Sequence, residues 1–235
     1  MKASFAGLLL LAGTVTAGEP DFTALREQLV DEVRQYAGYA GDEPFSDMVL
    51  DALNTVERHK YVPPAEVRYA YENRPLAIGY GQTISQPYIV ALMTDLLEPQ
   101  AGDVILEVGT GSGYQAAVLS GLVDHVYTIE IIEALANQGR SRLDRLGYDN
   151  ITTRLGDGYY GWKEHAPFDA IIVTAASSHV PPPLIEQLKP GGRMVIPVGG
   201  RFMTQLLLLL EKNEDGEVIT RQIGAVRFVP LTGEH

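Results

Sequence analysis

Residues 104–113, Val-Ile-Leu-Glu-Val-Gly-Thr-Gly-Ser-Gly, form the stretch that decides the fold. A short apolar run bounded by glycine is typical of a buried parallel strand. The glycines that follow let the chain turn sharply into a helix and let a ligand approach the backbone closely. A dinucleotide-binding GxGxxG turn would need glycine where this chain has Tyr114. The GxGxG pattern after an acidic residue therefore points away from NAD.

On the carboxyl side of this turn, short apolar runs alternate with helical periodicity, which predicts an α/β fold with a doubly wound, mostly parallel sheet. The expected order is helix 114–122, strand 126–129, helix 133–146, strand 151–154, strand 170–173, helix 184–188, turn 189–192 and strand 194–198. Two later apolar runs, 205–210 and 218–228, flank the turn signal Asn213-Glu214-Asp215-Gly216. We expect them to form an antiparallel hairpin at the edge of the sheet.

The amino-terminal part predicts a small helical subdomain over 18–75, followed by the main domain over 76–235. The predicted elements are a helix over 21–36, a loop over 38–44, a helix beginning after Ser46, an irregular stretch over 61–75 and a helix over 89–97. In the second helix, Ser46 is expected to be the N-cap and Phe45 a hydrophobic staple.

The first 17 residues have the pattern of a secretory signal. Met1-Lys2 is followed by an apolar stretch over 5–17 that ends in Val15-Thr16-Ala17, a small-residue cleavage site. The apolar stretch has 13 residues, which is too short to cross a bilayer that needs roughly 20 helical residues. We expect export, periplasmic or secreted, if this segment is cleaved, and no stable membrane association.

Composition excludes several mechanisms. The formal charge is −12, from 18 Lys+Arg and 30 Asp+Glu, so the average surface repels nucleic acid. The absence of cysteine removes thiol nucleophiles, disulfides and thiolate zinc sites. The five histidines show no ligand spacing, and we expect no metal site.

Three acidic residues follow or end successive predicted strands, namely Glu107, Glu130 and Asp157. A carboxylate in the position of Glu130 can accept hydrogen bonds from ribose hydroxyls. Together the three acids suit a ligand with a ribose, an adenine and a cationic amino acid, and they would repel a phosphate-rich one. This pattern favours S-adenosylmethionine over NAD or ATP, although each acid taken alone could equally be a helix cap.

Several segments carry a resemblance to one family. Residues 78–87, Ile-Gly-Tyr-Gly-Gln-Thr-Ile-Ser-Gln-Pro, and residues 106–114 closely resemble protein-L-isoaspartate O-methyltransferases, and the match continues through 156–158, 167–176, 189–192 and 227–231. It covers about residues 50 to 233. The resemblance implies a Rossmann-like class I S-adenosylmethionine-dependent methyltransferase that esterifies the carboxylate of L-isoaspartyl residues in damaged proteins and peptides. The resemblance also implies that members of this family are usually cytoplasmic.

The resemblance also implies roles for individual residues. The implied roles are Ser85 as the active-site serine, Thr83 and Ile84 shaping the substrate pocket, Gly109, Thr110, Gly111 and Gly113 around the methionine moiety, Glu130 on the ribose, and Asp157 and Gly158 on the adenine, with Glu107 as a further cofactor-binding residue. Thr232 is a further candidate cofactor contact. An isoaspartyl carboxylate is already ionised at neutral pH, so methyl transfer needs no general base. We therefore expect Ser85 to orient the substrate and not to attack it.

Two alternatives remain open. A methyltransferase of the same fold could act on nucleic acid or a small molecule, but the chain has no cysteine for cytosine-C5 chemistry, and Thr174-Ala175-Ala176 replaces the Asp/Asn-Pro-Pro-Tyr motif. The second alternative is an exported, noncatalytic binding protein that keeps the fold. We expect a monomer whose partners are isoaspartyl-containing proteins.

Overall fold

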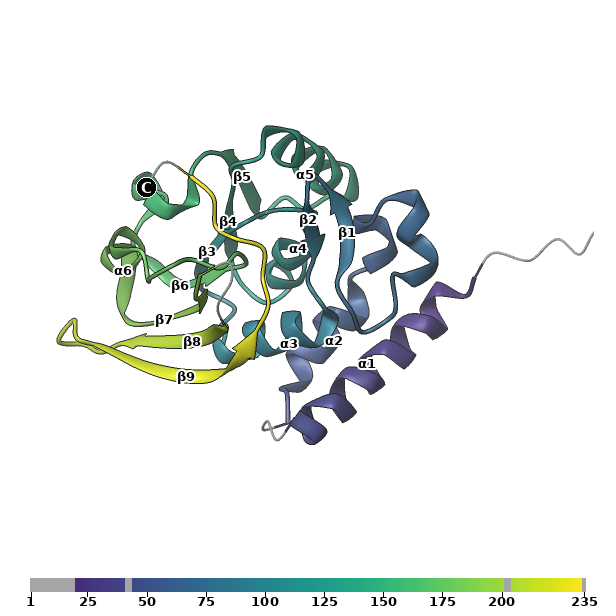
Figure 1. Ribbon diagram of the computed structural model, residues 1–235, viewed down its shortest axis with the longest axis horizontal. Helices are drawn as coiled ribbons and strands as arrows, with labels where there is room; N and C mark the ends of the chain where they lie inside the picture. The colour runs from purple at the N-terminus through teal and green to yellow at the C-terminus, as the bar shows by residue number, and fades with distance from the viewer. Residues whose placement is uncertain (1–19, 41–43, 201–203, 234–235) are drawn as a thin grey trace, which may run out of the picture.

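The computed structural model describes residues 20–40, 44–200 and 204–233, and Figure 1 shows their arrangement. The helices are α1 (Phe22–Ala40), α2 (Asp47–Thr55), α3 (Pro87–Leu96), α4 (Tyr114–Ser120), α5 (Glu133–Leu146) and α6 (Pro182–Gln187), with four short 3₁₀ turns η1 (Arg58–Tyr61), η2 (Pro64–Tyr69), η3 (Gly158–Tyr160) and η4 (Lys163–His165). The strands are β1 (Leu76–Gly79), β2 (Gln82–Ile84), β3 (Val104–Val108), β4 (His125–Glu130), β5 (Ile151–Leu155), β6 (Phe168–Val173), β7 (Leu188–Val198), β8 (Gln205–Lys212) and β9 (Val218–Val226).

The main sheet has the order β5-β4-β3-β6-β7-β8-β9. The first five strands in that order are parallel, whereas β7 pairs with β8, and β8 with β9, in antiparallel register. The predicted doubly wound sheet with a carboxyl-terminal antiparallel hairpin is therefore confirmed. The glycine turn after β3 lies at the point where strand order reverses, which is where such sheets bind ligands.

The central strands are buried on both faces because helices cover the sheet on two sides. Four of the five residues of β3 are buried, and β6 is buried except at Asp169. Continuous apolar runs of this kind are what a parallel sheet requires. The sheet therefore gives the carboxyl ends of β3, β4 and β6 a rigid base.

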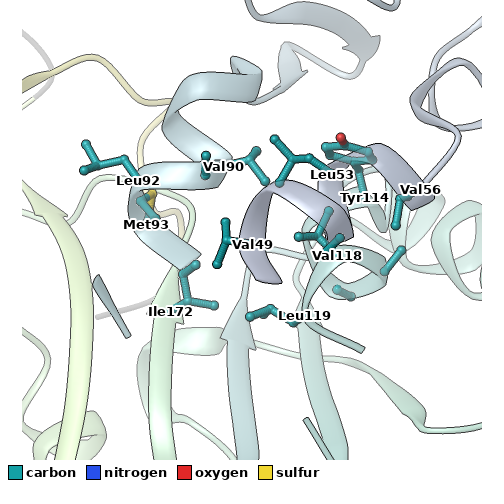
Figure 2. Packing of buried hydrophobic residues seen from close by; sticks show 14 of the residues in the cluster. Val49, Leu53, Val56, Val90, Leu92, Met93, Tyr114, Val118, Leu119 and Ile172 are labelled. Atoms are coloured by element: carbon teal, nitrogen blue, oxygen red, sulfur yellow. The ribbon is translucent and has the colours of Figure 1, made fainter. Parts of the chain in front are cut away.

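Helix α2 packs into the same core as the helices of the main sheet. In Figure 2 its side chains Val49 and Leu53 lie between α3 and α4, close to Val90 and Val118. All four residues belong to one continuous hydrophobic cluster that also includes residues of the sheet. Helix α2 of the amino-terminal part thus shares one hydrophobic core with the main sheet and its helices.

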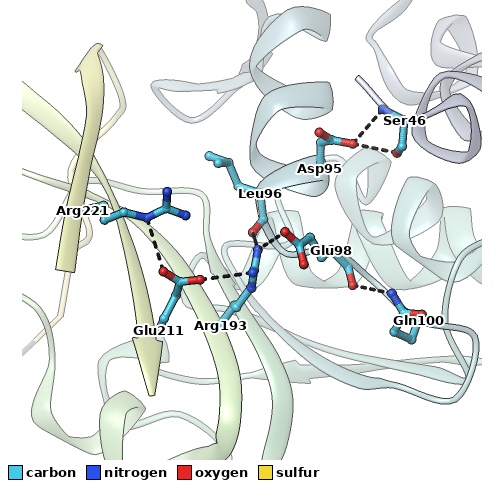
Figure 3. Close-up of polar contacts among 8 residues, drawn as sticks. All are labelled: Ser46, Asp95, Leu96, Glu98, Gln100, Arg193, Glu211 and Arg221. Atoms are coloured by element: carbon cyan, nitrogen blue, oxygen red, sulfur yellow. Dashed lines mark hydrogen bonds and ion pairs between the residues drawn. The ribbon is translucent and has the colours of Figure 1, made fainter. Parts of the chain in front are cut away.

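Ser46 is the N-cap residue of α2 as predicted, but the capping hydrogen bond expected from its side chain is not formed. Its hydroxyl donates instead to Asp95 Oδ1 at 2.6 Å, and its amide donates to the same oxygen at 3.0 Å (Figure 3). A carboxylate is a stronger acceptor than a neutral group, so Ser46 links the start of α2 to α3. Phe45 is buried against Tyr88, with ring centroids 5.9 Å apart.

Three other elements differ from the sequence expectation. Helix α1 continues through Gly38 to Ala40, and the hairpin of β1 and β2 was not predicted. The expected turn at 189–192 is part of β7, where the pairing with β6 jumps from Leu188 to Arg193. The four residues between them form a bulge in an otherwise continuous strand.

Arg193 on β7 holds the sheet to the end of α3. Its guanidinium donates to the main-chain oxygen of Leu96 at 3.2 Å and pairs with Glu98 at 2.6 Å and Glu211 at 3.1 Å (Figure 3).

The predicted signal segment 1–17 lies outside the described residues. None of the helices that the structure describes is long and apolar enough to cross a bilayer.

Candidate functional site

A cleft opens where the carboxyl ends of β3, β4 and β6 meet, with an open volume of about 530 Å³. Its lining residues are Gln82, Thr83, Val108, Gly109, Gly111, Ile129, Glu130, Ile131, Ile132, Gly158, Thr174, Ala175, Val229, Pro230, Leu231 and Thr232. We call it the cofactor cleft. The structure thus brings together Gly109, Gly111, Glu130 and Gly158 from the sequence prediction, and places Thr232 beside them.

Gly109 lines the cofactor cleft at a position where an added side chain would not fit. Its φ is +103°, and a Cβ added to it would lie 2.4 Å from Thr174 Oγ1. That hydroxyl donates to the main-chain oxygens of Val108 at 3.1 Å and Gly109 at 2.8 Å. Thr174 was not among the predicted site residues, since its role depends on the pairing of β6 with β3.

The carboxylate of Glu130 is held in place by the backbone of two loops. Its Oε2 accepts from the amide of Gly111 at 2.8 Å, and its Oε1 accepts from the amide of Ile132 at 2.9 Å. The residue is 7% exposed and lines the cleft. Each oxygen keeps a second lone pair, so the carboxylate can still accept a hydrogen bond from a sugar hydroxyl.

Glu107 is fully buried beneath the glycine turn. Its Oε2 accepts from the Thr128 hydroxyl, which lies 2.6 Å from the Thr110 hydroxyl. Its Oε1 has no hydrogen-bond partner among the described residues. Burial raises the pKa of this carboxyl to about 8, the hydrogen bond from Thr128 opposes the shift, and the nearby Glu130 charge adds to it. An orphaned buried acceptor of this kind suits a cationic ligand.

Gly158 lines the cofactor cleft, whereas its neighbour Asp157, also predicted to contact the cofactor, does not. Asp157 caps η3 by accepting from the Tyr159 amide at 3.0 Å, and it lines a shallower hollow with Ile131, which also lines the cofactor cleft. Gly158 is buried, and a Cβ on it would lie 2.3 Å from Val108 Cγ1. Gly113 is buried at the N-cap of α4, where an added Cβ would meet Leu143 at 3.2 Å.

A second hollow, which we call the outer groove, adjoins the cofactor cleft and has an open volume of about 1020 Å³. It is lined by Tyr36, Pro75, Thr83, Ser85, Gln86, Tyr88, Ile89, Thr174, Ala225, Val226, Arg227, Phe228 and Val229. The two hollows share Thr83, Thr174 and Val229. Ser85 also lines a narrow inner space with Ile84, Glu107, Gly109, Thr110 and Gly111. The structure therefore places Ser85 beside the glycine turn.

Arg58 supports Ser85 from inside the protein, a role that was not predicted from the sequence. The side chain is fully buried, and its Nη2 donates to the main-chain oxygens of Ser85 at 2.7 Å and Arg74 at 3.4 Å. The guanidinium carbon lies 4.9 Å from the centre of the Tyr114 ring. Burial lowers the pKa of Arg58 to about 10, so the group stays cationic at neutral pH.

The two hollows differ in charge. Among the described residues that line the cofactor cleft, Glu130 alone is charged, and among those that line the outer groove, Arg227 alone is charged. The cofactor cleft therefore suits a positively charged ligand that carries no phosphate, and the outer groove suits an anion. In the described ranges, no cluster of three or more His, Asp or Glu residues could hold a metal ion.

Comparison with known proteins identifies the family. The family model described as protein-L-isoaspartate(D-aspartate) O-methyltransferase matches residues 25–235. The chain is 59% identical over 231 residues to protein-L-isoaspartate O-methyltransferase 1 of Cupriavidus necator, covering 97% of this chain and 89% of that protein. It is 57% identical over 240 residues to protein-L-isoaspartate O-methyltransferase 2 of Syntrophobacter fumaroxidans, covering 99% and 97%.

Solved structures give the same result. One protein-L-isoaspartate O-methyltransferase superposes with a TM-score of 0.80 at 29% identity, over 88% of this chain and 66% of that one. A second, described as a protein-L-isoaspartate O-methyltransferase from Plasmodium falciparum in complex with S-adenosyl-L-homocysteine, superposes with a TM-score of 0.74 at 25% identity, over 88% and 98%.

Proposed function

This chain belongs to the protein-L-isoaspartate O-methyltransferase family, and from that premise we propose that methyl transfer takes place where the cofactor cleft meets the outer groove beside Ser85. The enzyme transfers a methyl group from S-adenosylmethionine to the free carboxylate of L-isoaspartyl residues. The observation that carries the proposal is the opposite charge of the two hollows, Glu130 in the cleft and Arg227 in the groove.

The residues of the cofactor cleft fit S-adenosylmethionine. The buried Glu107 has an orphaned oxygen that suits a cation, and Gly109 leaves room for close approach to the backbone. In the proposed site Glu130 holds the ribose, Asp157 and Gly158 the adenine, and Gly109, Thr110, Gly111 and Gly113 the methionine part. The S-adenosyl-L-homocysteine bound in the Plasmodium falciparum relative, which is S-adenosylmethionine without its methyl group, supports this cofactor.

The protein contributes orientation and exclusion of water. S-adenosylmethionine, when bound, supplies a methyl group on a sulfonium, and the C–S electron pair stays with sulfur as the carboxylate oxygen forms its new bond to carbon. No proton moves, so no general base is required. The Ser85 hydroxyl holds the substrate carboxylate in line, and Thr83 and Ile84 shape the pocket around it. Holding two reactants in attack geometry can supply a large part of the rate.

A serine variant tests this assignment. Ser85→Ala should lower kcat for an isoaspartyl peptide by roughly 100-fold, the usual range for loss of one well-placed polar group in a buried site. Calorimetry should find the dissociation constant of S-adenosylmethionine within about twofold of the wild-type value, because the cofactor contacts are unchanged. Thr23→Ala, outside both hollows, is the matched control. Unchanged turnover in Ser85→Ala would refute the role of this serine.

We also propose that residues 1–17 direct export and that the mature enzyme is a monomer without a nucleic-acid partner. The support is the signal-like sequence and the charge of −12. Mass spectrometry of the amino terminus in fractionated cells should detect a form cleaved after Ala17 outside the cytoplasm. An intact Met1 confined to the cytoplasm would contradict export. Size-exclusion chromatography with light scattering, and a nucleic-acid binding assay, test the other two statements.

A further inference from the structure

The guanidinium of Arg227 is a cation on an acidic protein. It is exposed and lines the outer groove, and it follows β9 directly. Among the residues that the structure describes, no carboxylate lies within ion-pair distance of it, whereas Arg221 within β9 pairs with Glu211 at 3.3 Å. The formal charge of the chain is −12, and a cation with no ion-pair partner in its described part is available to a ligand.

The backbone that carries Arg227 is held on its carboxyl side. The buried Gln205 side chain accepts from the Phe228 amide at 2.5 Å and donates to the Phe228 oxygen at 3.1 Å. The Val229 oxygen then accepts from the Ala176 amide at 2.8 Å. Arg227 is therefore presented from a fixed point beside the groove, so its long side chain is the only part left to move.

We propose that Arg227 binds the reacting carboxylate of the isoaspartyl substrate and draws it toward Ser85. The inference rests on the outer groove being the substrate side of the site, as proposed above. A guanidinium presents parallel donors that match a carboxylate. Charge at the rim of a site also raises the rate of encounter with an anion in a manner that salt suppresses. Arg227 thereby offsets, locally, the repulsion that the acidic surface exerts on the substrate.

The test compares Arg227→Gln, Arg227→Lys and the control Arg221→Gln with the wild type. Two isoaspartyl peptides are used that are identical except for Glu or Gln beside the isoaspartyl residue. Arg227→Gln should raise KM about tenfold for both peptides, the loss expected for one partly exposed charge-assisted hydrogen bond. Arg227→Lys should recover most of that loss, and Arg221→Gln should behave as the wild type.

Two further measurements separate binding of the carboxylate from a general effect on the fold. In the wild type, kcat/KM should fall as sodium chloride rises from about 0.05 to about 0.5 M, and in Arg227→Gln this dependence should be weaker. The dissociation constant of S-adenosylmethionine should be the same in both.

Three results would overturn the inference. An unchanged KM in Arg227→Gln would show that the cation does not meet the substrate. A rise in KM confined to the Glu-containing peptide would show that Arg227 binds the neighbouring glutamate side chain and not the isoaspartyl carboxylate. No turnover by the wild type on either peptide would overturn the proposed function together with this inference, whereas the first two results leave the function standing.

Discussion

The Nη2 atom of Arg58 donates a 2.7 Å hydrogen bond to the main-chain oxygen of Ser85. The Arg58 side chain has no exposed surface, and its Nε and Nη1 atoms have no acceptor within bonding geometry among the described residues. Burying a cation with so few partners costs free energy. Such a cost at the proposed substrate site indicates that the position of Ser85 matters more than the stability lost.

Arg58→Met tests that relationship. The variant keeps the bulk of the side chain and removes a buried charge, so the free energy of unfolding should stay within about 2 kcal/mol of the wild type. The kcat for isoaspartyl peptides should fall at least about tenfold, because the Ser85 backbone loses its support. Denaturant unfolding and steady-state kinetics measure the two effects. A variant with normal kcat, or one whose loss of kcat follows from unfolding alone, would contradict the positioning role.

The pH dependence of stability should report Glu107. Its carboxyl has an ordinary pKa of 4.5, and burial raises the pKa to about 8 in the folded protein. Between these values the folded state holds a proton that the unfolded state lacks, so this group's contribution to stability is lost as pH rises through the window. From pH 4.5 to 8 the wild type should therefore lose free energy of unfolding through this group, whereas Glu107→Gln should not. The difference between the variant and the wild type should shift in favour of the variant as pH rises. Urea unfolding at several pH values checks this, and a constant difference would argue against a buried, protonated Glu107.

The two acids of the cofactor site should discriminate differently between cofactor and product. Glu130→Gln should raise the dissociation constants of S-adenosylmethionine and S-adenosylhomocysteine by the same factor, about tenfold, because both contain the ribose. Above the Glu107 pKa of about 8, where its carboxyl is ionised, Glu107→Gln should weaken S-adenosylmethionine more than S-adenosylhomocysteine, since only the former carries a sulfonium charge. Calorimetric titration with both ligands measures the ratio. Equal changes in the two dissociation constants in Glu107→Gln at that pH would contradict a role for the Glu107 charge.

Gly158→Ala should destabilise the protein by about 1–3 kcal/mol, the usual cost of overpacking. The added Cβ would overlap Val108 Cγ1, which lies 2.3 Å from its ideal position. The clash can be tested with Val108→Ala, which removes the overlapping methyl group. The double variant should lose less stability than the sum of the two single variants, as measured by denaturant unfolding. Strict additivity would mean that the two residues do not touch.

The parallel part of the sheet could be predicted because its strands are short, continuous apolar runs. The runs at 104–108 and 170–173 were read correctly, and both are central in the sheet. The glycine turn and Glu130 could be predicted for the same reason, since they follow directly from strand ends. The roles assigned to these residues stay predictions, because their placement in the cleft does not by itself measure binding.

Contacts between distant segments could not be predicted. Ser46 has a strong local preference for capping, in which its side-chain oxygen accepts from a backbone amide, but its hydroxyl instead donates to Asp95, 49 positions further along the chain. Arg58 stands between Glu57 and His59 in a charged run that is typical of a solvent-exposed surface, yet it is fully buried. The β1–β2 hairpin was missed because its strands have four and three residues, which is too short for alternation to be recognised.

The placement of α1 (Figure 1) decides where the enzyme can be attached to a solid support. Phe22 begins this helix and stacks on His59, with ring centroids 3.9 Å apart, whereas Tyr36 near the other end lines the outer groove. Fourteen helical residues separate the two by about 21 Å. Leu231 and Thr232, by contrast, line the cofactor cleft close to the carboxyl terminus. A linker joined ahead of Phe22 therefore leaves the entrance free for large damaged proteins, while one joined after Thr232 would crowd it.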